Sequence, residues 1–106
     1  MAKYLIRASY TAEGVKGLLK DGGTKRRKVV TDMMKPLGIT VESFYYALGD
    51  ADVYLIVEAP DLAAVTAVSL TTNASGAVKV NTTVLMTPEE VDAAVQKSVS
   101  YTPPGR

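Results

Sequence analysis

The stretch from Phe44 to Glu58 constrains the fold of this chain most, because it reads as two strands joined by a tight acidic turn. Gly49 and Asp50 supply the turn, since glycine tolerates positive φ angles and aspartate bonds to its own backbone. The residues on both sides are rich in aromatic and β-branched types, which suit a pleated and half-buried surface. The rest of the chain is organised around this predicted hairpin.

Alternating apolar and polar residues predict four β-strands in all. They cover residues 3–10, 39–48, 53–59 and 78–86. In the third strand Val53, Leu55 and Val57 share the face that we expect to point into the core. The opposite face of the sheet mixes polar and apolar residues, which suits contact with a partner sheet. Whether Tyr45 or Tyr46 lies on that open face depends on the register of the turn.

Two helices are predicted between the strands. The first begins after Thr11 as its N-cap, is interrupted by the pair Gly22-Gly23, and continues after Thr24, which is expected to act as a second cap. The second begins after Asp61. Its narrow apolar stripe consists of Leu62, Val65 and Val68.

The strongest local signal lies near the C-terminus. Thr87-Pro88-Glu89-Glu90 has the residue types of a capping box with proline at the first helical position, which predicts a third helix. Its apolar residues are expected to face the body of the protein: Val91, Ala94 and Val95. Residues 1–100 are predicted to form one domain, and residues 101–106, with two prolines and a glycine, a C-terminal tail.

The order strand, helix, strand, strand, helix, strand predicts an α+β fold of the ferredoxin-like βαββαβ type, with an antiparallel sheet and an extra C-terminal helix. A chain of 106 residues fits a single domain. Both main helices are expected on one face of the sheet, so the other face stays uncovered. We therefore expect the protein to be at least a dimer.

The composition excludes several kinds of site. The chain has no cysteine and no histidine, which removes disulfides, thiolate metal sites, a cysteine nucleophile and the usual haem ligand. A formal net charge of +1 gives no general attraction to nucleic acid or to an anionic membrane. No apolar run approaches the ~20 residues of a membrane span, and the first residues lack a signal-peptide pattern. We expect a cytoplasmic protein without cofactor, metal, nucleic-acid partner or membrane attachment.

Arg7 and Glu58 are candidate binding residues on the open sheet face. Counting by twos places both on that face, and we expect them to form a partly buried ion pair that fixes how two sheets dock. In the functional alternative, Arg7 binds a carboxylate or phosphate through its planar guanidinium and Glu58 holds it in place.

Arg27 and three tyrosines are further candidates for ligand binding. Arg27 belongs to the basic run 25–28, which follows two glycines and would hold an anion if the start of the helix were free. A solvated helix face is the simpler interpretation of such a run. Tyr10, Tyr45 and Tyr54, together with Tyr46, would line a pocket or, more simply, pack as aromatic side chains with one satisfied hydroxyl.

The turn residues Gly49, Asp50 and Asp52 offer a third candidate, a small oxygen-rich cation site. Two carboxylates without further ligands make a poor metal site. The simpler interpretation is an acidic hairpin turn in which Asp52 accepts hydrogen bonds from backbone amides.

Nearly the whole chain resembles the GYD-domain family, small bacterial proteins grouped with the dimeric α/β-barrel superfamily. The matching segments are Tyr4-Leu5 through Gly14, Gly22-Gly23 with Arg27, Phe44 through Asp52, Ala74 through Val78, and Thr82 through Glu90. The motif that names the family, Gly-x-Tyr-Asp, stands here as Gly49-Asp50-Ala51-Asp52, with alanine in place of tyrosine. The resemblance implies a homo-oligomer built as a dimeric α/β barrel. Its superfamily includes cofactor-free monooxygenases, lactone isomerases and haem enzymes.

Three functional hypotheses follow. The first is a homo-oligomeric protein that binds a small ligand, with an anion as one candidate, between its subunits. The second is a cofactor-independent enzyme of the monooxygenase or isomerase type, which would use a cluster of tyrosine, arginine and carboxylate in the same space. The third is an interaction or scaffold protein without ligand chemistry.

Overall fold

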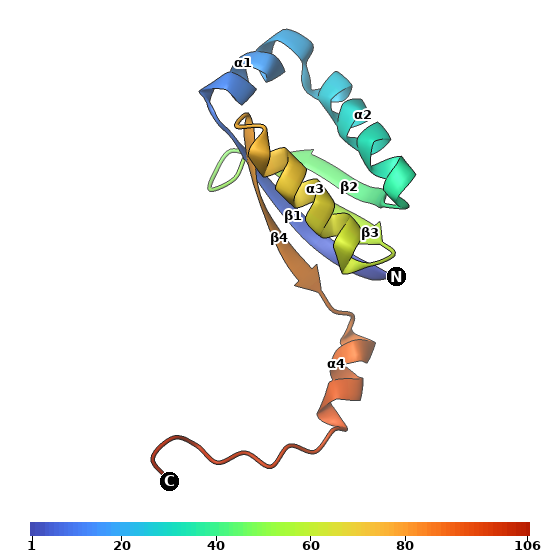
Figure 1. The fold of residues 1–106 in the computed structure, drawn as a ribbon, viewed down its shortest axis with the longest axis vertical. Helices are drawn as coiled ribbons and strands as arrows, with labels where there is room; N and C mark the ends of the chain where they lie inside the picture. Colours follow the sequence, from blue (N-terminus) through green and yellow to red (C-terminus); the bar gives the residue numbers. More distant parts are fainter.

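A computed structural model describes all 106 residues and contains a four-stranded antiparallel sheet with four α-helices (Figure 1). The strands are β1 (Ala2–Tyr10), β2 (Thr40–Tyr46), β3 (Val53–Ala59) and β4 (Val78–Leu85). Their order in the sheet is β2-β3-β1-β4, so β1 and β3 are the central strands. This arrangement confirms the predicted α+β class and is consistent with the ferredoxin-like plan.

The predicted hairpin is also confirmed, because β2 and β3 are adjacent antiparallel strands with Tyr46 opposite Val53. The register shifts between Val41 and Ser43, which is the mark of a β-bulge in β2. As a result Phe44 and Tyr46 share the inner face of the sheet, whereas Tyr45 lies opposite Tyr54 on the open face. The open question of the second strand is thereby settled in favour of Tyr45 on the open face.

The core lies between the inner face of the sheet and the helices that cover it. Along β3 buried and half-buried residues alternate, and Val53, Leu55 and Val57 are each at most 3% exposed. The same alternation puts Tyr4, Ile6 and Ala8 of β1 into the core. Burial of these apolar side chains is the main force that holds the helices on this face.

The segment between β1 and β2 forms α1 (Ala12–Asp21), α2 (Gly23–Met34) and the short 3-10 helix η1 (Lys35–Leu37). Thr11 caps α1 as predicted, since its hydroxyl accepts a hydrogen bond from the Gly14 amide. The prediction for Thr24 is wrong. Gly22, with a φ of 82°, ends α1 and is the N-cap of α2, so the helix resumes one residue before Thr24.

The helix α3 (Leu62–Ala74) is capped as predicted, because the Asp61 carboxylate accepts a hydrogen bond of 2.8 Å from the Ala64 amide. Val65 and Val68 are buried against the sheet, but Leu62 is 61% exposed, which corrects the predicted stripe. The reason is position: β3 ends at Ala59, opposite Ala2 at the end of the sheet, so the first turn of α3 has little sheet beneath it.

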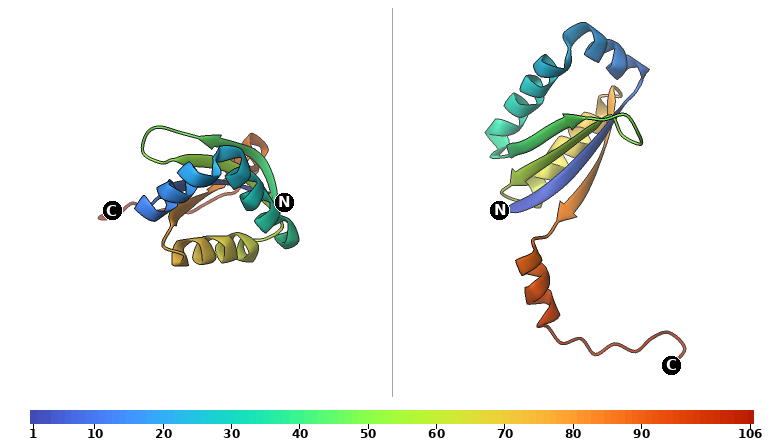
Figure 2. Two further views of the ribbon diagram at one scale, coloured as in Figure 1. Left: turned by 90° about the horizontal axis from the view of Figure 1, so that it is seen from above. Right: turned by 180° about the vertical axis from the view of Figure 1, so that it is seen from behind.

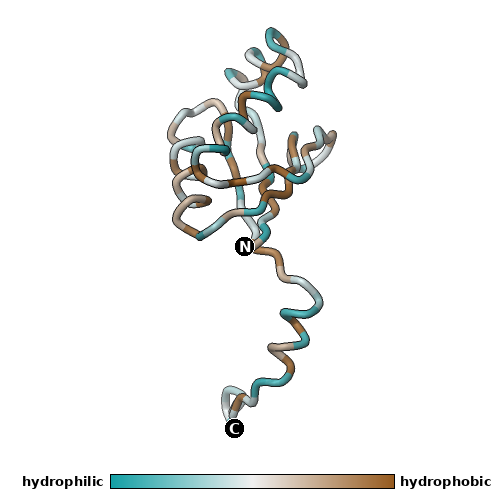
Figure 3. The backbone as a smooth tube through the Cα atoms, turned by 90° about the vertical axis from the view of Figure 1, so that its right-hand side faces the viewer, coloured by the Kyte–Doolittle hydropathy of each residue, from teal (hydrophilic) through white to brown (hydrophobic).

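The last helix, α4 (Pro88–Val95), has the predicted capping box, in which Thr87 and Glu90 bond to each other's backbone amides. The expectation that it packs on the body is wrong. None of its residues is buried, and Val95 is 72% exposed. β4 runs off the end of the sheet at Leu85, so α4 and the tail extend away as an arm (Figures 1 and 3). The radius of gyration is 17.2 Å, against about 13 Å for a compact chain of this length.

Candidate functional site

Between α2, α3 and the inner face of the sheet lies a cavity of about 350 Å³, here called the helix-side cleft. It exists because α2 packs over β2 while α3 packs over β4, which leaves the middle of the sheet partly uncovered (Figure 2). Ten of its fourteen lining residues are hydrophobic, and Arg26 is its single charged one. The apolar lining comes from Ile6, Val30, Met33, Met34, Phe44, Leu55, Val68, Ala77, Val78 and Val80.

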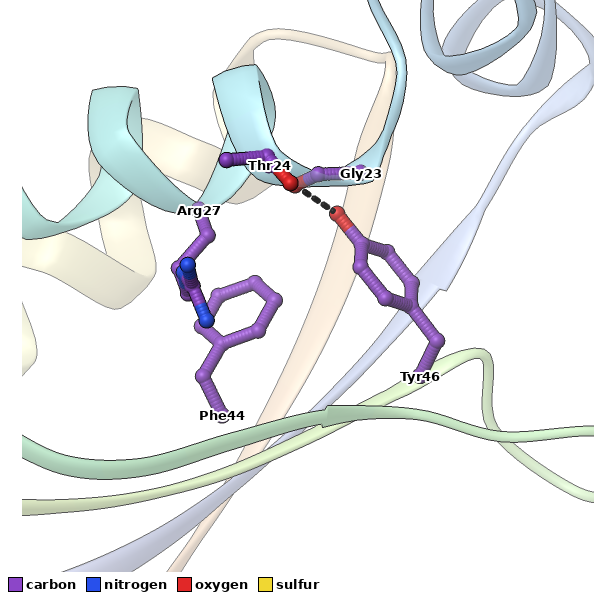
Figure 4. A pocket seen from close by; sticks show the side chains of 5 residues that line it. All are labelled: Gly23, Thr24, Arg27, Phe44 and Tyr46. Carbon is purple, nitrogen blue, oxygen red and sulfur yellow. Dashed lines mark hydrogen bonds between the residues drawn. The ribbon is translucent and has the colours of Figure 1, made fainter.

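A second cavity of about 300 Å³ adjoins the cleft and shares Phe44 with it. Its other lining residues are Gly23, Thr24, Arg27 and Tyr46. Figure 4 shows the Arg27 side chain next to the ring of Phe44, with Tyr46 on the other side of that ring. Two successive arginines of α2 therefore line two neighbouring cavities. Arg26 lines the apolar cleft, and Arg27 lines the more polar cavity.

Tyr46 ties the start of α2 to the sheet. Its hydroxyl donates a hydrogen bond of 2.9 Å to the Gly23 carbonyl, and its ring meets Phe44 edge to face with centroids 5.5 Å apart. A Cβ atom on Gly23 would lie 2.9 Å from the ring carbon Cε2 of Tyr46. Glycine at position 23 therefore permits the close approach of helix and ring.

The Tyr46 hydroxyl lies in a polar cluster at the rim of the second cavity, close to Tyr10, Arg26 and Arg27. Partial burial raises the pKa of Tyr46 above its ordinary value, and the neighbouring Tyr10 adds to the rise. The positive charges of Arg26 and Arg27 oppose it. The phenol stays protonated at neutral pH and donates its hydrogen to the Gly23 carbonyl, so it is the two arginines at this rim that suit the binding of an anion.

The turn carboxylate of Asp52 has a structural role. Asp52 Oδ2 accepts a hydrogen bond of 2.8 Å from the Tyr10 amide, and the Asp52 amide donates to the Ala8 carbonyl at 2.9 Å. The side chain thus extends the ladder between β1 and the hairpin, as the simpler interpretation of the turn predicted. Asp50 is exposed, and no cluster of three or more residues of metal-ligating type occurs in the chain.

Four of the sequence-predicted candidates lie on the open face instead. Arg7 of β1 is opposite Tyr54 on one side and Asn81 on the other, and Tyr54 is opposite Tyr45. One residue from each strand thus forms a row across the sheet, in the order Tyr45, Tyr54, Arg7 and Asn81. Glu58 lies on the same face but outside this row.

The predicted ion pair between Arg7 and Glu58 does not form. Glu58 is opposite Lys3, four residues from Arg7 along β1, which is a separation of about 14 Å. The pairing that does form on this face joins Lys3 and Glu42 at 2.8 Å, and that bond raises the pKa of Lys3 above its ordinary value. Counting by twos gave the correct face, but the prediction failed on the register, which the strand lengths do not determine.

The candidates therefore separate into two groups. Tyr10 and Arg27 both lie near Tyr46 on the helix side of the sheet, whereas Arg7, Tyr45, Tyr54 and Glu58 lie on the open face. Sequence reasoning missed Arg26 and Phe44. The helical spacing of Arg26, Val30 and Met33 was a usable signal, since residues three and four apart share one face of a helix.

Comparison with known protein families matches residues 4–95 to the family described as GYD domain. No curated protein and no solved structure matches the chain. None of the helices combines the length and apolar character that crossing a membrane requires.

Proposed function

The chain belongs to the GYD-domain family, and from the geometry of the helix-side cleft we propose that it binds a small molecule with an apolar body and an anionic head. The observation that carries the proposal is a cavity of about 350 Å³ with a mostly apolar lining and Arg26 as its single charged group. Small-molecule sites have this character, since apolar walls supply affinity and a few polar groups fix the orientation.

The head group would be a carboxylate, sulfonate or phosphate. Arg26 presents a planar guanidinium that suits two-point hydrogen bonding to such groups. Its side chain is half-buried, which strengthens the interaction relative to one in open solvent. Arg27 lies close by at the second cavity and adds positive potential.

The proposal is for binding without chemical conversion. Arginine side chains stay protonated, and the pKa of Tyr46 is raised, so the polar groups at the rim do not accept a proton at neutral pH. The functional groups described here orient and hold a ligand.

A second candidate site is the open face, where the row of Tyr45, Tyr54, Arg7 and Asn81 would lie between two subunits. We propose in addition that the protein forms a homo-oligomer in which a second subunit covers this face. It is supported by the half-buried apolar residues Leu5 and Ile56 at the centre of the face, which no helix of the same chain covers.

The test uses anilinonaphthalene sulfonate, a probe with an apolar ring system and one sulfonate. We expect saturable binding to the folded wild type, and an affinity at least about tenfold lower for Arg26→Gln, because a charge-assisted hydrogen bond is lost. Val30→Phe should also weaken binding, since the larger side chain fills the cleft. Lys25→Gln, on the same helix but exposed, is the matched control and should bind like the wild type.

Urea unfolding of each variant shows that it is folded in the titration. Unchanged affinity in both Arg26→Gln and Val30→Phe would exclude the helix-side cleft as the site. Loss of binding in Arg7→Gln together with full binding in Arg26→Gln would move the site to the open face between subunits.

A further inference from the structure

The two ends of the molecule carry amphipathic helices whose apolar pairs are exposed. At one end α4 projects from the body, and its apolar residues Val91 and Val95 are 45% and 72% exposed. At the other end α1 extends beyond the sheet, where Val15 and Leu19 are 41% and 81% exposed and no residue of the helix is buried (Figure 1). Each helix has its apolar pair at positions i and i+4, which form one stripe.

The two ends carry opposite charge. The helix α4 has three acidic side chains and no basic one, so its net charge is −3. The helices α1 and α2 together have six basic and three acidic side chains, a net charge of +3. Opposite potentials of this kind bring two surfaces together and set their orientation.

The charges beside the apolar stripes are free to pair with another molecule. The chain forms three ion pairs, Lys3–Glu42, Lys25–Asp21 and Lys28–Asp32. Lys16 and Lys20 of α1, which flank Leu19, are in none of them, and neither are Glu89 and Asp92 of α4. Glu13 of α1 is also in none of them, so α1 alone carries no net charge and the surplus of positive charge at this end comes from residues 25–28 of α2. Lys16 and Lys20 are the free cations that follow Val15 and Leu19 directly in the helix.

The helices α1 and α4 of one chain lie at opposite ends of its long axis, which measures 57 Å, so they cannot meet each other (Figures 1 and 3). A twofold rotation about an axis perpendicular to the long axis exchanges the two ends. In a pair of copies related in this way, each α4 reaches the α1 end of the other copy, and both contacts form at once.

We propose that α4 is an exchange arm: in the homodimer, the acidic helix α4 of each copy packs against helix α1 at the positively charged end of the other copy. Val91 and Val95 cover Leu19 and Val15 of the second copy, and Asp92 and Glu89 lie near its Lys16 and Lys20. The occupant of the exposed α1 surface is a second copy of this chain, because the matching charge and apolar spacing occur in the same sequence. The contact is reciprocal, so it closes the dimer and leaves no free arm.

Disulfide trapping tests this contact directly, because the chain contains no cysteine of its own. In full-length Leu19→Cys/Val95→Cys, mild oxidation should convert most of the protein to a covalent species of twice the chain mass on a non-reducing gel. The control is Leu70→Cys/Val95→Cys, which places the first cysteine on the exposed surface of α3 and should stay largely unlinked. Equal trapping in both variants, a disulfide within one chain, or a ladder of higher multimers would overturn the proposal.

Charge reversal at exposed positions supplies a second readout. Glu89→Lys/Asp92→Lys and Lys16→Glu/Lys20→Glu should each raise the dimer dissociation constant about tenfold at low salt, and less at 1 M salt. The chain that carries all four substitutions should recover most of the affinity, because the charges are exchanged and complementary again. A four-fold variant that dimerises no better than either reversed chain would exclude the contact, whether or not ligand binding in the helix-side cleft is intact.

Discussion

Gly14 allows α1 to pack closely against Ala77, the residue before β4, and against Tyr10 of β1. A Cβ atom at this position would overlap with the Ala77 carbonyl and lie 2.9 Å from a ring carbon of Tyr10. We expect Gly14→Ala to lower the free energy of unfolding by about 1–3 kcal/mol, as overpacking does. Gly17, in the same helix, has no atom within 4 Å of such a Cβ, so Gly17→Ala should be neutral or stabilise by up to ~1 kcal/mol.

Urea unfolding measured on both variants checks this pair, with equal m values as evidence that the same transition is compared. Gly14→Ala as stable as Gly17→Ala would mean that α1 shifts freely on the sheet. The prediction depends on contacts between segments more than 60 residues apart in the chain.

At the residue scale, local chemistry was predictable and pairing across strands was not. The Thr11, Asp61 and Thr87 caps follow from residue type and the next three positions, and all three form. The backbone bond of Asp52 follows from the preference of aspartate for turns. Arg26 was missed in favour of Arg27, because one step along a helix turns the side chain by about 100° and only the packing of α2 decides which arginine meets the cleft.

At the scale of elements, the only buried side chain of α2 is that of Met34, at the C-terminal end of the helix. Met34 is 2% exposed, whereas the adjacent Met33 is 41% exposed at the edge of the helix-side cleft. We expect Met34→Ala to destabilise by about 2–5 kcal/mol, since it leaves a core cavity, and Met33→Ala by much less. Thermal and urea unfolding compare the two, and equal effects would contradict the orientation of α2 described here.

The strands and helices were predictable as elements because each has a local period or cap, whereas their packing was predictable only in part. The alternation in β3 gave its bounds and its buried face. The bulge between Val41 and Ser43 left no clear signal, and it decides that Phe44 and Tyr46 line the cavities. The prediction that α4 packs on the body of its own chain was wrong. An apolar stripe shows that a helix has a surface to bury, but it does not show which molecule covers that surface.

For the whole molecule, the proposed homo-oligomer depends on the open face of the sheet. We expect the wild type to be a dimer or larger at micromolar concentration, and Ile56→Glu to shift it towards monomer, because a charge at the centre of the face is costly to bury. Leu70→Glu, at an exposed position on α3, is the control and should stay oligomeric. Light scattering at several concentrations measures this, and a monomeric wild type would contradict it.

The strand order has a consequence for how the chain is made. The central strand β1 is nine residues long and precedes both of its neighbours in the chain, since β3 and β4 begin only at residues 53 and 78. Its pairings are therefore long-range, which slows folding in comparison with a helical bundle of equal size. Until β4 has been synthesised one edge of β1 stays unpaired, and an unpaired strand edge can associate with another chain.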